Sequence, residues 1–129
     1  MIKTKIRKTK SVSEDRTNVI ELDAKGQSVG RLASEIASYL QDKHLPDYAP
    51  NKEGETVVEI KNIQDINFTG KKWTEKKYYS HSGYLGNMKE EIALKVFKKN
   101  PEEILRLAVL GMLPKNRLRK PRIKRLKFS

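Results

Sequence analysis

The sequence predicts an α/β domain, in which helices pack against a parallel sheet. Two short extended runs, residues 19–22 and 56–60, lie on either side of a helical pattern of apolar residues. More than ten residues separate the two runs, which is too long for a tight hairpin and typical of a crossover between parallel strands. With 129 residues, the chain has room for one such domain and its extensions.

The first helix is predicted from one continuous apolar stripe with helical spacing. The members of the stripe are Val29, Leu32, Ala33, Ile36, Ala37 and Leu40. Ser28 is the expected N-cap, and Pro46 lies just past the expected end. In the turn before this helix, we expect Gly26 to permit the turn and Gly30 to let the helix approach the sheet closely.

A third strand and two helices are predicted further along the chain. Ile63 and residues 66–69 indicate the strand, which ends at Gly70. Asn87 and Glu90 match the capping box of a helix start. The expected buried face of that helix consists of Met88, Ile92, Val96 and Phe97.

The last predicted helix begins at a second capping box, formed by Asn100 and Glu103, with Pro101 at the first helical position. Its residues 104–110 are apolar nearly all round, which predicts burial on more than one side. Gly111 and Pro114 end it.

The positive charge is concentrated at the two ends of the chain. Of the formal net charge of +12, residues 1–16 carry +4 and residues 111–129 carry +8, whereas residues 17–110 are neutral. We therefore expect a globular body, residues 17–110, with a basic N-terminal arm and a basic C-terminal tail that packs on the body and on RNA. Like charges without internal partners favour a polyanion, whose counterions they release. A solvated, solubilising tail is the alternative.

A second cationic cluster lies in residues 71–84, which contain four lysines, four aromatic residues and a histidine. Aromatic faces stack on bases or pack against sugars, while lysines neutralise the adjacent phosphates. The segment therefore favours RNA binding. The alternative is an edge hairpin whose lysines discourage aggregation.

Signals of catalysis, metal binding and membrane insertion are missing from the sequence. There is no cysteine, and neither His44 nor His81 has a partner at metal-ligand or catalytic spacing. The turn at residues 26–31 lacks the motifs of phosphate-binding loops. The longest nearly apolar stretch, residues 105–113, is too short to span a bilayer, and the basic start leads into polar residues, unlike a signal peptide. We expect no catalytic residue, metal, cofactor or small-molecule substrate, and no membrane partner.

Several motifs resemble a known family in one collinear register over residues 17–128. They are Tyr79-Ser80-His81-Ser82-Gly83-Tyr84 with Gly86 and Lys89, Gly111-Met112-Leu113-Pro114-Lys115-Asn116-Arg117-Leu118, residues 23–34, and Lys43-His44 with Pro46, Tyr48 and Pro50. The set closely resembles ribosomal protein thirteen of the bacterial large subunit. Asn87 and Arg119 stand where that family usually has glycine.

The resemblance implies a three-layer α/β/α domain on a four-stranded, largely parallel sheet in the order 3-2-1-4, with the last strand at residues 125–128. It also implies a structural, non-enzymatic protein of the cytoplasmic ribosome. Such a protein binds large-subunit rRNA early in assembly and contacts neighbouring ribosomal proteins.

The expected RNA contacts fall into three groups. The main group is Lys115, Arg117, Arg119, Lys120, Arg122, Lys124, Arg125 and Lys127. The second is Lys71, Lys72, Trp73, Lys76, Lys77, Tyr78, Tyr79, His81, Tyr84 and Lys89. The third is Arg31, Lys43 and His44.

Two other functions compete with this interpretation. A double-stranded DNA-binding or chromatin-like protein needs an exposed recognition helix, but the predicted helices use their faces for burial. A nucleotide-dependent enzyme is suggested by the glycine turn after the first strand, but the phosphate motif is incomplete.

Overall fold

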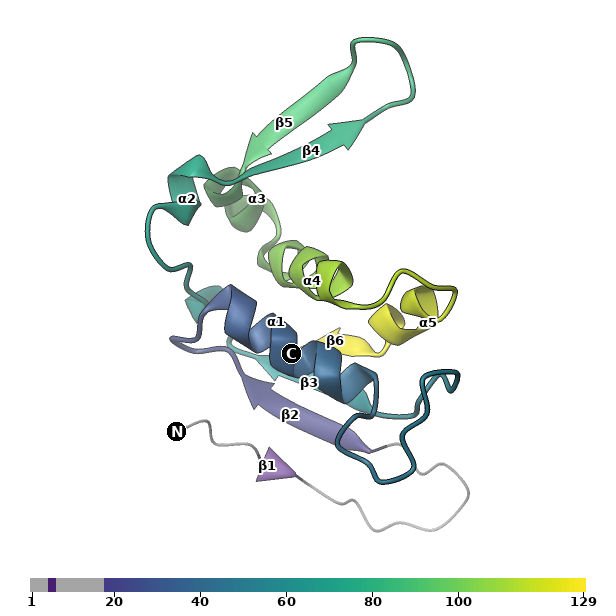
Figure 1. Cartoon of the computed structure of the whole chain (residues 1–129). Coiled ribbons are helices and arrows are strands. Elements are labelled where there is room, and N and C mark those ends of the chain that lie inside the picture. Colours follow the sequence, from purple (N-terminus) through teal and green to yellow (C-terminus); the bar gives the residue numbers. More distant parts are fainter. Residues whose placement is uncertain (1–4, 7–17) are drawn as a thin grey trace.

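The computed structural model of the chain describes residues 5–6 and 18–129, and Figure 1 shows their arrangement. In chain order, the elements are β1 (Lys5–Ile6), β2 (Val19–Asp23), α1 (Val29–Leu40), β3 (Val57–Lys61), η1 (Ile63–Asp65), α2 (Lys72–Glu75), β4 (Lys77–His81), β5 (Met88–Ile92), α3 (Ala93–Lys99), α4 (Pro101–Met112), α5 (Arg119–Lys124) and β6 (Leu126–Phe128). The predicted α/β class is confirmed, because β2 and β3 flank α1 in the chain and pair in parallel. Apart from β1, the predicted N-terminal arm, residues 1–16, lies outside the described residues.

The main sheet has the strand order β1-β2-β3-β6. Strands β2, β3 and β6 are parallel, whereas β1 pairs antiparallel with β2. The expected four-stranded, largely parallel sheet is therefore wrong in part, since its parallel core has only three strands. The expected order 3-2-1-4 is also wrong. The C-terminal strand pairs with β3 and not with β2, because β1 occupies the other edge of β2.

Residues 66–69 do not form the expected third strand of this sheet. Asn62 has a left-handed backbone with φ of 56°, which turns the chain into η1 directly after β3. Asn67 then forms an isolated parallel bridge with Ser28, and its carbonyl accepts from the N–H of Val29 at 3.0 Å. The segment thus pairs with the start of α1, and Phe68 remains buried beside it.

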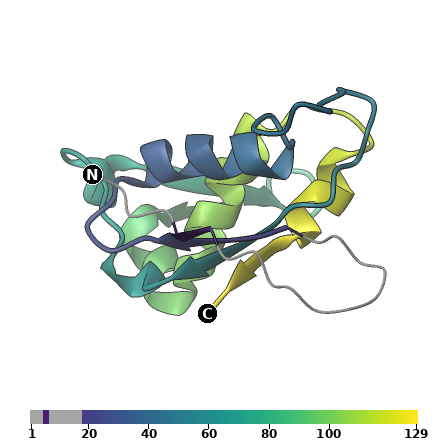
Figure 2. The same ribbon diagram turned by 90° about the horizontal axis from the view of Figure 1, so that it is seen from below.

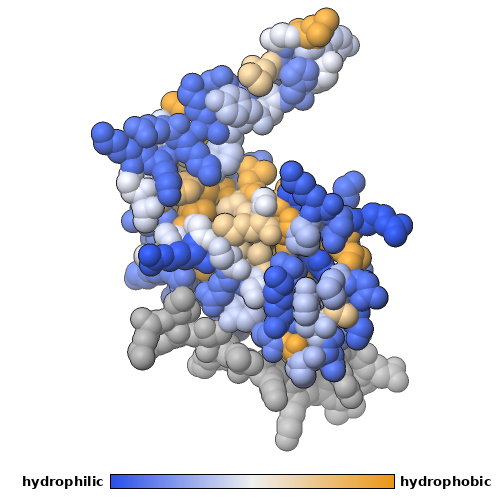
Figure 3. All heavy atoms as spheres, viewed as in Figure 1, coloured by the Kyte–Doolittle hydropathy of each residue, from blue (hydrophilic) through white to orange (hydrophobic). Residues whose placement is uncertain are grey.

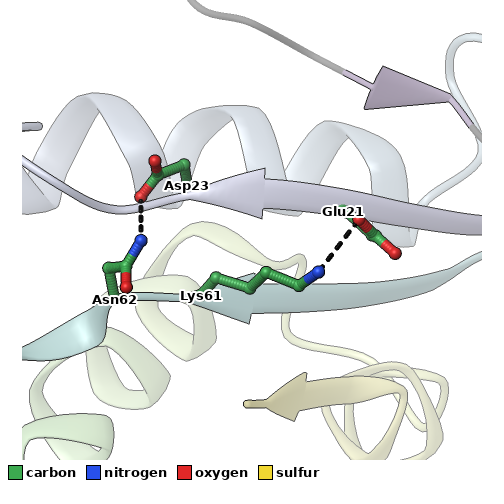
Figure 4. Close-up of polar contacts among 4 residues, drawn as sticks. All are labelled: Glu21, Asp23, Lys61 and Asn62. Carbon is green, nitrogen blue, oxygen red and sulfur yellow. Dashed lines mark hydrogen bonds and ion pairs between the residues drawn. The ribbon is translucent and has the colours of Figure 1, made fainter.

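One face of the main sheet is apolar and the other carries charge. Strand residues alternate between the two faces, and the buried set is Ile20, Leu22, Val58, Ile60 and Leu126. On the other face, Glu21 lies opposite Glu59, and Glu59 opposite Lys127. Lys61 pairs with Glu21 at 3.1 Å, as Figure 4 shows. The expected three-layer arrangement requires a second apolar face, so these charges do not fit it.

Helix α1 covers the apolar face, and Figure 2 shows it lying along one side of β2 and β3. All six residues of its predicted stripe are buried, which confirms the prediction. Gly26 has a φ of +69°, as its turn requires. The expected role of Gly30 is wrong, because a Cβ atom at this position meets nothing within 4 Å.

Helix α4 packs beside α1 and buries Ile104, Leu105 and Val109. It begins after Asn100, as predicted, but the Asn100 side chain makes no capping hydrogen bond. Its broad apolar surface is explained by the neighbours on several sides, since α4 contacts α1, α3 and α5.

Strands β4 and β5 form a separate antiparallel hairpin that projects away from the main sheet (Figure 1). The predicted helix start at Asn87 is wrong, because residues 88–92 are strand β5 and the helix begins at Ala93. Asn87 instead donates to Ser82 Oγ at 2.7 Å across the hairpin turn. Met88 and Ile92, expected in a buried helix face, are 60% and 44% exposed.

Candidate nucleic-acid interface

The C-terminal segment, residues 111–129, is folded as α5 and β6 and does not lie free of the body. Arg122 of α5 is only 1% exposed. Its guanidinium donates to the backbone carbonyls of Lys52 at 2.7 Å and Glu53 at 3.2 Å. A guanidinium buried this deeply needs such hydrogen-bond partners. The expected phosphate contact of Arg122 does not fit this burial, because its charge is enclosed by the protein.

Arg125 also points into the protein. Its guanidinium donates to the carbonyls of Leu40 and Thr56, both at 3.0 Å, and to that of Glu53 at 2.6 Å. Burial lowers the pKa of Arg125, and the nearby carboxylate of Asp42 opposes this shift. Arg125 therefore joins the end of α1 to the start of β3, and it too is withdrawn from the candidate interface.

Arg119 has a mixed position. It is half-buried, and its guanidinium donates to the backbone carbonyl of Leu110 at the end of α4. This bond holds α5 against α4 and leaves Arg119 little freedom to reach a phosphate.

The other five cations of the C-terminal segment are exposed: Lys115, Arg117, Lys120, Lys124 and Lys127. Four of them surround α5, whereas Lys127 lies on the charged face of the sheet opposite Glu59. The described C-terminal segment therefore presents one cluster of four cations, which we call the α5 cluster: Lys115, Arg117, Lys120 and Lys124.

The predicted aromatic and cationic cluster is divided by the fold. Trp73 of α2 packs edge-on between Phe68 and Phe97, with ring centroids 4.8 and 4.9 Å apart. Its indole N–H donates to Asn67 Oδ1 at 3.4 Å. Trp73 therefore joins the core to α3, and the expected stacking of this ring on a base does not fit its packing.

Lysines gather around α2 at the base of the hairpin, where Lys71, Lys72 and Lys76 are exposed. Lys76 Nζ lies 5.4 Å from the ring centroid of Tyr78, a cation–π distance. Tyr78 is half-buried, and this burial raises the pKa of its hydroxyl.

Farther along the hairpin, the aromatic side chains are free to make contacts. Tyr79 is 60% and Tyr84 79% exposed. His81 is exposed, and its Nδ1 accepts from the backbone N–H of Gly83 at 2.9 Å. Lys77 pairs with Glu90 at 3.0 Å, which raises the pKa of the lysine. Lys89 is exposed on the adjoining strand.

The third predicted group is split between the two ends of α1. Arg31 is exposed in the first turn, whereas Lys43 and His44 are exposed beyond the last turn. The 12 residues of α1 span about 18 Å, so these side chains do not form one site. His44 packs edge-on against Tyr39, with ring centroids 5.3 Å apart.

A groove brings Arg31 together with lysines of the second group. It has a volume of about 740 Å³ and is lined by the first turns of α1, the last turns of α4 and residues 68–76, including Lys72 and Lys76. Leu107 and Met112 also line this groove, although no motif in the sequence indicates a site at either position. Because they lie far from Arg31 in the chain, local spacing carries no signal of the association.

Within residues 5–6 and 18–129, the part of the chain that the structure describes, no group of three or more metal-ligating side chains comes together. Its helices are all too short or too polar to cross a membrane.

The fold and these surfaces define a basic α/β protein with exposed cations on several elements, the class of protein that suits a nucleic-acid partner. Residues 17–128 match the family model of ribosomal protein L13. The chain belongs to the ribosomal protein L13 family, which confirms the resemblance found in its motifs.

Curated relatives agree with this assignment. The chain is 50% identical to the large ribosomal subunit protein uL13 of Syntrophobacter fumaroxidans over 108 residues, which are 84% of this chain and 76% of that relative. It is 42% identical to the protein of the same name from Helicobacter pylori over 120 residues, 93% of this chain and 85% of that relative. For the relative from Wolinella succinogenes, the identity is 39% over 120 residues, 93% and 86% of the two chains.

Proposed function

We propose that this protein is a structural constituent of the large ribosomal subunit, which binds large-subunit rRNA and supports early subunit assembly. The observation that carries the proposal is its membership of the ribosomal protein L13 family. The exposed cations of the body and of the C-terminal segment support it, because they suit a phosphate backbone. Neighbouring large-subunit proteins are its expected protein partners, and no catalytic step is involved.

The proposed mechanism is the neutralisation of several phosphates by separate cationic patches, together with recognition of RNA shape. Exposed side chains make the contacts, while buried cations hold the patches in place. The proposed contacts are the α5 cluster, the base of the hairpin with Lys71, Lys72 and Lys76, the hairpin with Tyr79, His81, Tyr84 and Lys89, and the two ends of α1 with Arg31, Lys43 and His44.

A salt titration tests this mechanism. Each phosphate contact that is removed lowers the slope of log binding constant against log salt concentration by about 0.7–0.9. We expect the triple variant Lys115→Gln, Arg117→Gln, Lys120→Gln to reduce the slope for deproteinised large-subunit rRNA by about 2.

A matched control removes three cations that pair with glutamates, Lys61, Lys99 and Arg106. This control should change the slope less, because those charges are already compensated. Equal slopes for the wild type and the α5-cluster variant would contradict the phosphate role.

The double-stranded DNA-binding alternative is favoured by no feature of the described residues. The two longest described helices, α1 and α4, bury their apolar faces in the core. Their exposed faces carry one arginine each, Arg31 and Arg106, whereas a recognition helix presents several basic and amide side chains to the major groove. Competition between rRNA and duplex DNA at a fixed salt concentration separates the two functions, and preferential binding of the duplex would support the alternative.

A further inference from the structure

The groove between α1 and α4 carries one sign of charge. Arg31, Lys72 and Lys76 line it, and its lining contains no Asp or Glu. Among the described residues, these three cations form no ion pair; Lys72 Nζ donates only to a hydroxyl, Thr69 Oγ1, at 3.2 Å. The groove therefore presents uncompensated positive charge, which attracts an anionic chain.

Two glycines line the same groove, Gly30 from α1 and Gly111 from α4. Gly30 is the second residue of α1 and Gly111 the last but one of α4, and at neither position does the helix itself favour glycine over alanine. A Cβ atom at either position would meet nothing within 4 Å. Neither glycine is therefore required by the packing of the protein itself.

The backbone does not explain these two glycines either. Gly26, Gly54, Gly70, Gly83 and Gly86 all have positive φ angles, which favour glycine. The expected role of Gly111 in ending the helix is wrong, because α4 continues through it to Met112. Gly30 and Gly111 have no positive φ. They are the two glycines of the chain for which the fold gives no reason, and both face one cationic groove.

The floor of the groove is apolar where it is open. Leu107 and Met112 of α4 are 38% and 43% exposed. Ser34 donates to Met112 Sδ at 3.3 Å and thereby joins the two helices at the floor. Figure 3 shows apolar surface in the middle of the body with hydrophilic residues on both sides. An apolar floor beside cations suits a ligand that carries both phosphate groups and apolar surface.

We propose that this groove binds a sugar–phosphate segment of the RNA, and that Gly30 and Gly111 keep the floor clear for its close approach. Arg31, Lys72 and Lys76 contact the phosphates, and Leu107 and Met112 contact a ribose or a base edge. The absence of acids from the lining favours RNA over a protein segment. This inference rests on the proposed function, whose salt-titration test uses Lys115, Arg117 and Lys120, residues outside the groove lining.

The test uses the substitutions Gly30→Ala and Gly111→Ala in the full chain, singly and together. We expect each variant to melt at the same temperature as the wild type or higher, because alanine favours the helix and its methyl group meets open space. We expect the double variant to bind deproteinised large-subunit rRNA at least fivefold more weakly, with the salt slope unchanged because no charge is removed.

Ser38→Thr is the matched control, because it adds one methyl group to α1 outside the groove lining. It should bind rRNA like the wild type. In hydroxyl-radical footprints, the double glycine variant should lose protection at one short stretch of nucleotides. Arg31→Gln should lose protection at the same stretch and also lower the salt slope.

Two results would overturn the inference. In the first, the glycine variants bind rRNA like the wild type, while the α5-cluster variant shows a smaller slope of log binding constant against log salt concentration. The groove proposal then fails and the proposed function stands. In the second, the glycine variants bind isolated rRNA normally but enter large subunits poorly, which assigns the groove to a protein neighbour. If neither set of variants alters rRNA binding, the proposed function itself fails.

Discussion

Arg122 and Lys52 lie 70 residues apart in the chain, yet the guanidinium of Arg122 donates to the backbone carbonyl of Lys52 at 2.7 Å. This contact fastens α5 to the loop between α1 and β3. The basic character of the C-terminal segment therefore has two sources. Some of its cations are exposed and available to a partner, whereas others hydrogen-bond to backbone carbonyls of the protein itself.

Arg122→Ala should lower the free energy of unfolding by about 3 kcal/mol, because the carbonyls of Lys52 and Glu53 lose their charged donor and a fully buried side chain is removed. Urea unfolding of the full chain measures this loss. Lys120→Ala, at an exposed position of the same helix, should change stability by less than about 0.5 kcal/mol. Equal stabilities of the two variants would contradict the internal role of Arg122.

Gly54→Ala should be more destabilising than Gly70→Ala. Both positions have positive φ, but only at Gly54 would a Cβ atom collide with a neighbour, the carboxylate oxygen Oδ2 of Asp42. That carboxylate also accepts from the N–H of Glu55 at 2.9 Å. We expect a loss of about 1 kcal/mol at Gly70, from the left-handed backbone alone, and at least twice that at Gly54. Denaturant midpoints compare the two, and similar losses would argue against the collision.

Trp73 and Tyr84 should respond oppositely to substitution. Trp73→Ala removes a ring that packs against Phe68 and Phe97, so the melting temperature should fall. Tyr84→Ala removes an exposed ring, so stability should be kept while rRNA affinity falls by about 1–3 kcal/mol if the ring stacks on a base. Thermal melts and filter binding give the two readouts. Full rRNA affinity of Tyr84→Ala would exclude the stacking.

Asp23 gives the fold a pH-dependent contribution. Its pKa lies below the usual 3.8, because Oδ1 accepts hydrogen bonds from the Asn62 side chain, which has the larger effect, and from the backbone N–H of Lys25. A carboxyl with a lowered pKa stabilises the fold above its unfolded-state pKa, and the contribution is lost as the pH falls through the folded-state pKa. Asn62→Ala should therefore reduce stability near neutral pH, and its difference from the wild type should shrink below about pH 4.

Urea midpoints at several pH values measure this difference. Gln64→Ala, at an exposed position of η1, is the control and should show no such convergence. A difference between Asn62→Ala and wild type that is constant down to acid pH would remove the carboxylate from the explanation.

Sequence patterns predicted those elements that carry a regular apolar repeat along their own residues. The stripe of α1 and the β-branched run of β3 were identified because a helix face or a buried strand repeats in the sequence. The pattern from Asn87 to Glu90 misled, since the same residues that cap a helix also serve a hairpin turn. The pairing of β4 with β5 favours the hairpin turn over the helix start. Such pairing depends on both strands, so the residues around Asn87 alone do not predict it.

The candidate site was predictable in composition but not in arrangement. Exposed and buried arginines look alike in a sequence, so the internal positions of Arg122 and Arg125 depended on carbonyls contributed by residues far away in the chain. For the same reason, the sequence does not show that Trp73, a predicted RNA contact, packs against Phe68 and Phe97 and is partly buried. The groove has no signature in the sequence, because Gly30 and Gly111 come to line it only in the folded protein.

The late position of β6 also affects how the protein is made. Strand β3 receives this neighbour only after the 65 residues from Lys61 to Leu126 have been added. At translation rates of about 5–20 residues per second, that interval is about 3–13 s. During that time, the edge of β3 that later pairs with Leu126 lacks its partner strand, and an unpaired strand edge is prone to pair with another chain.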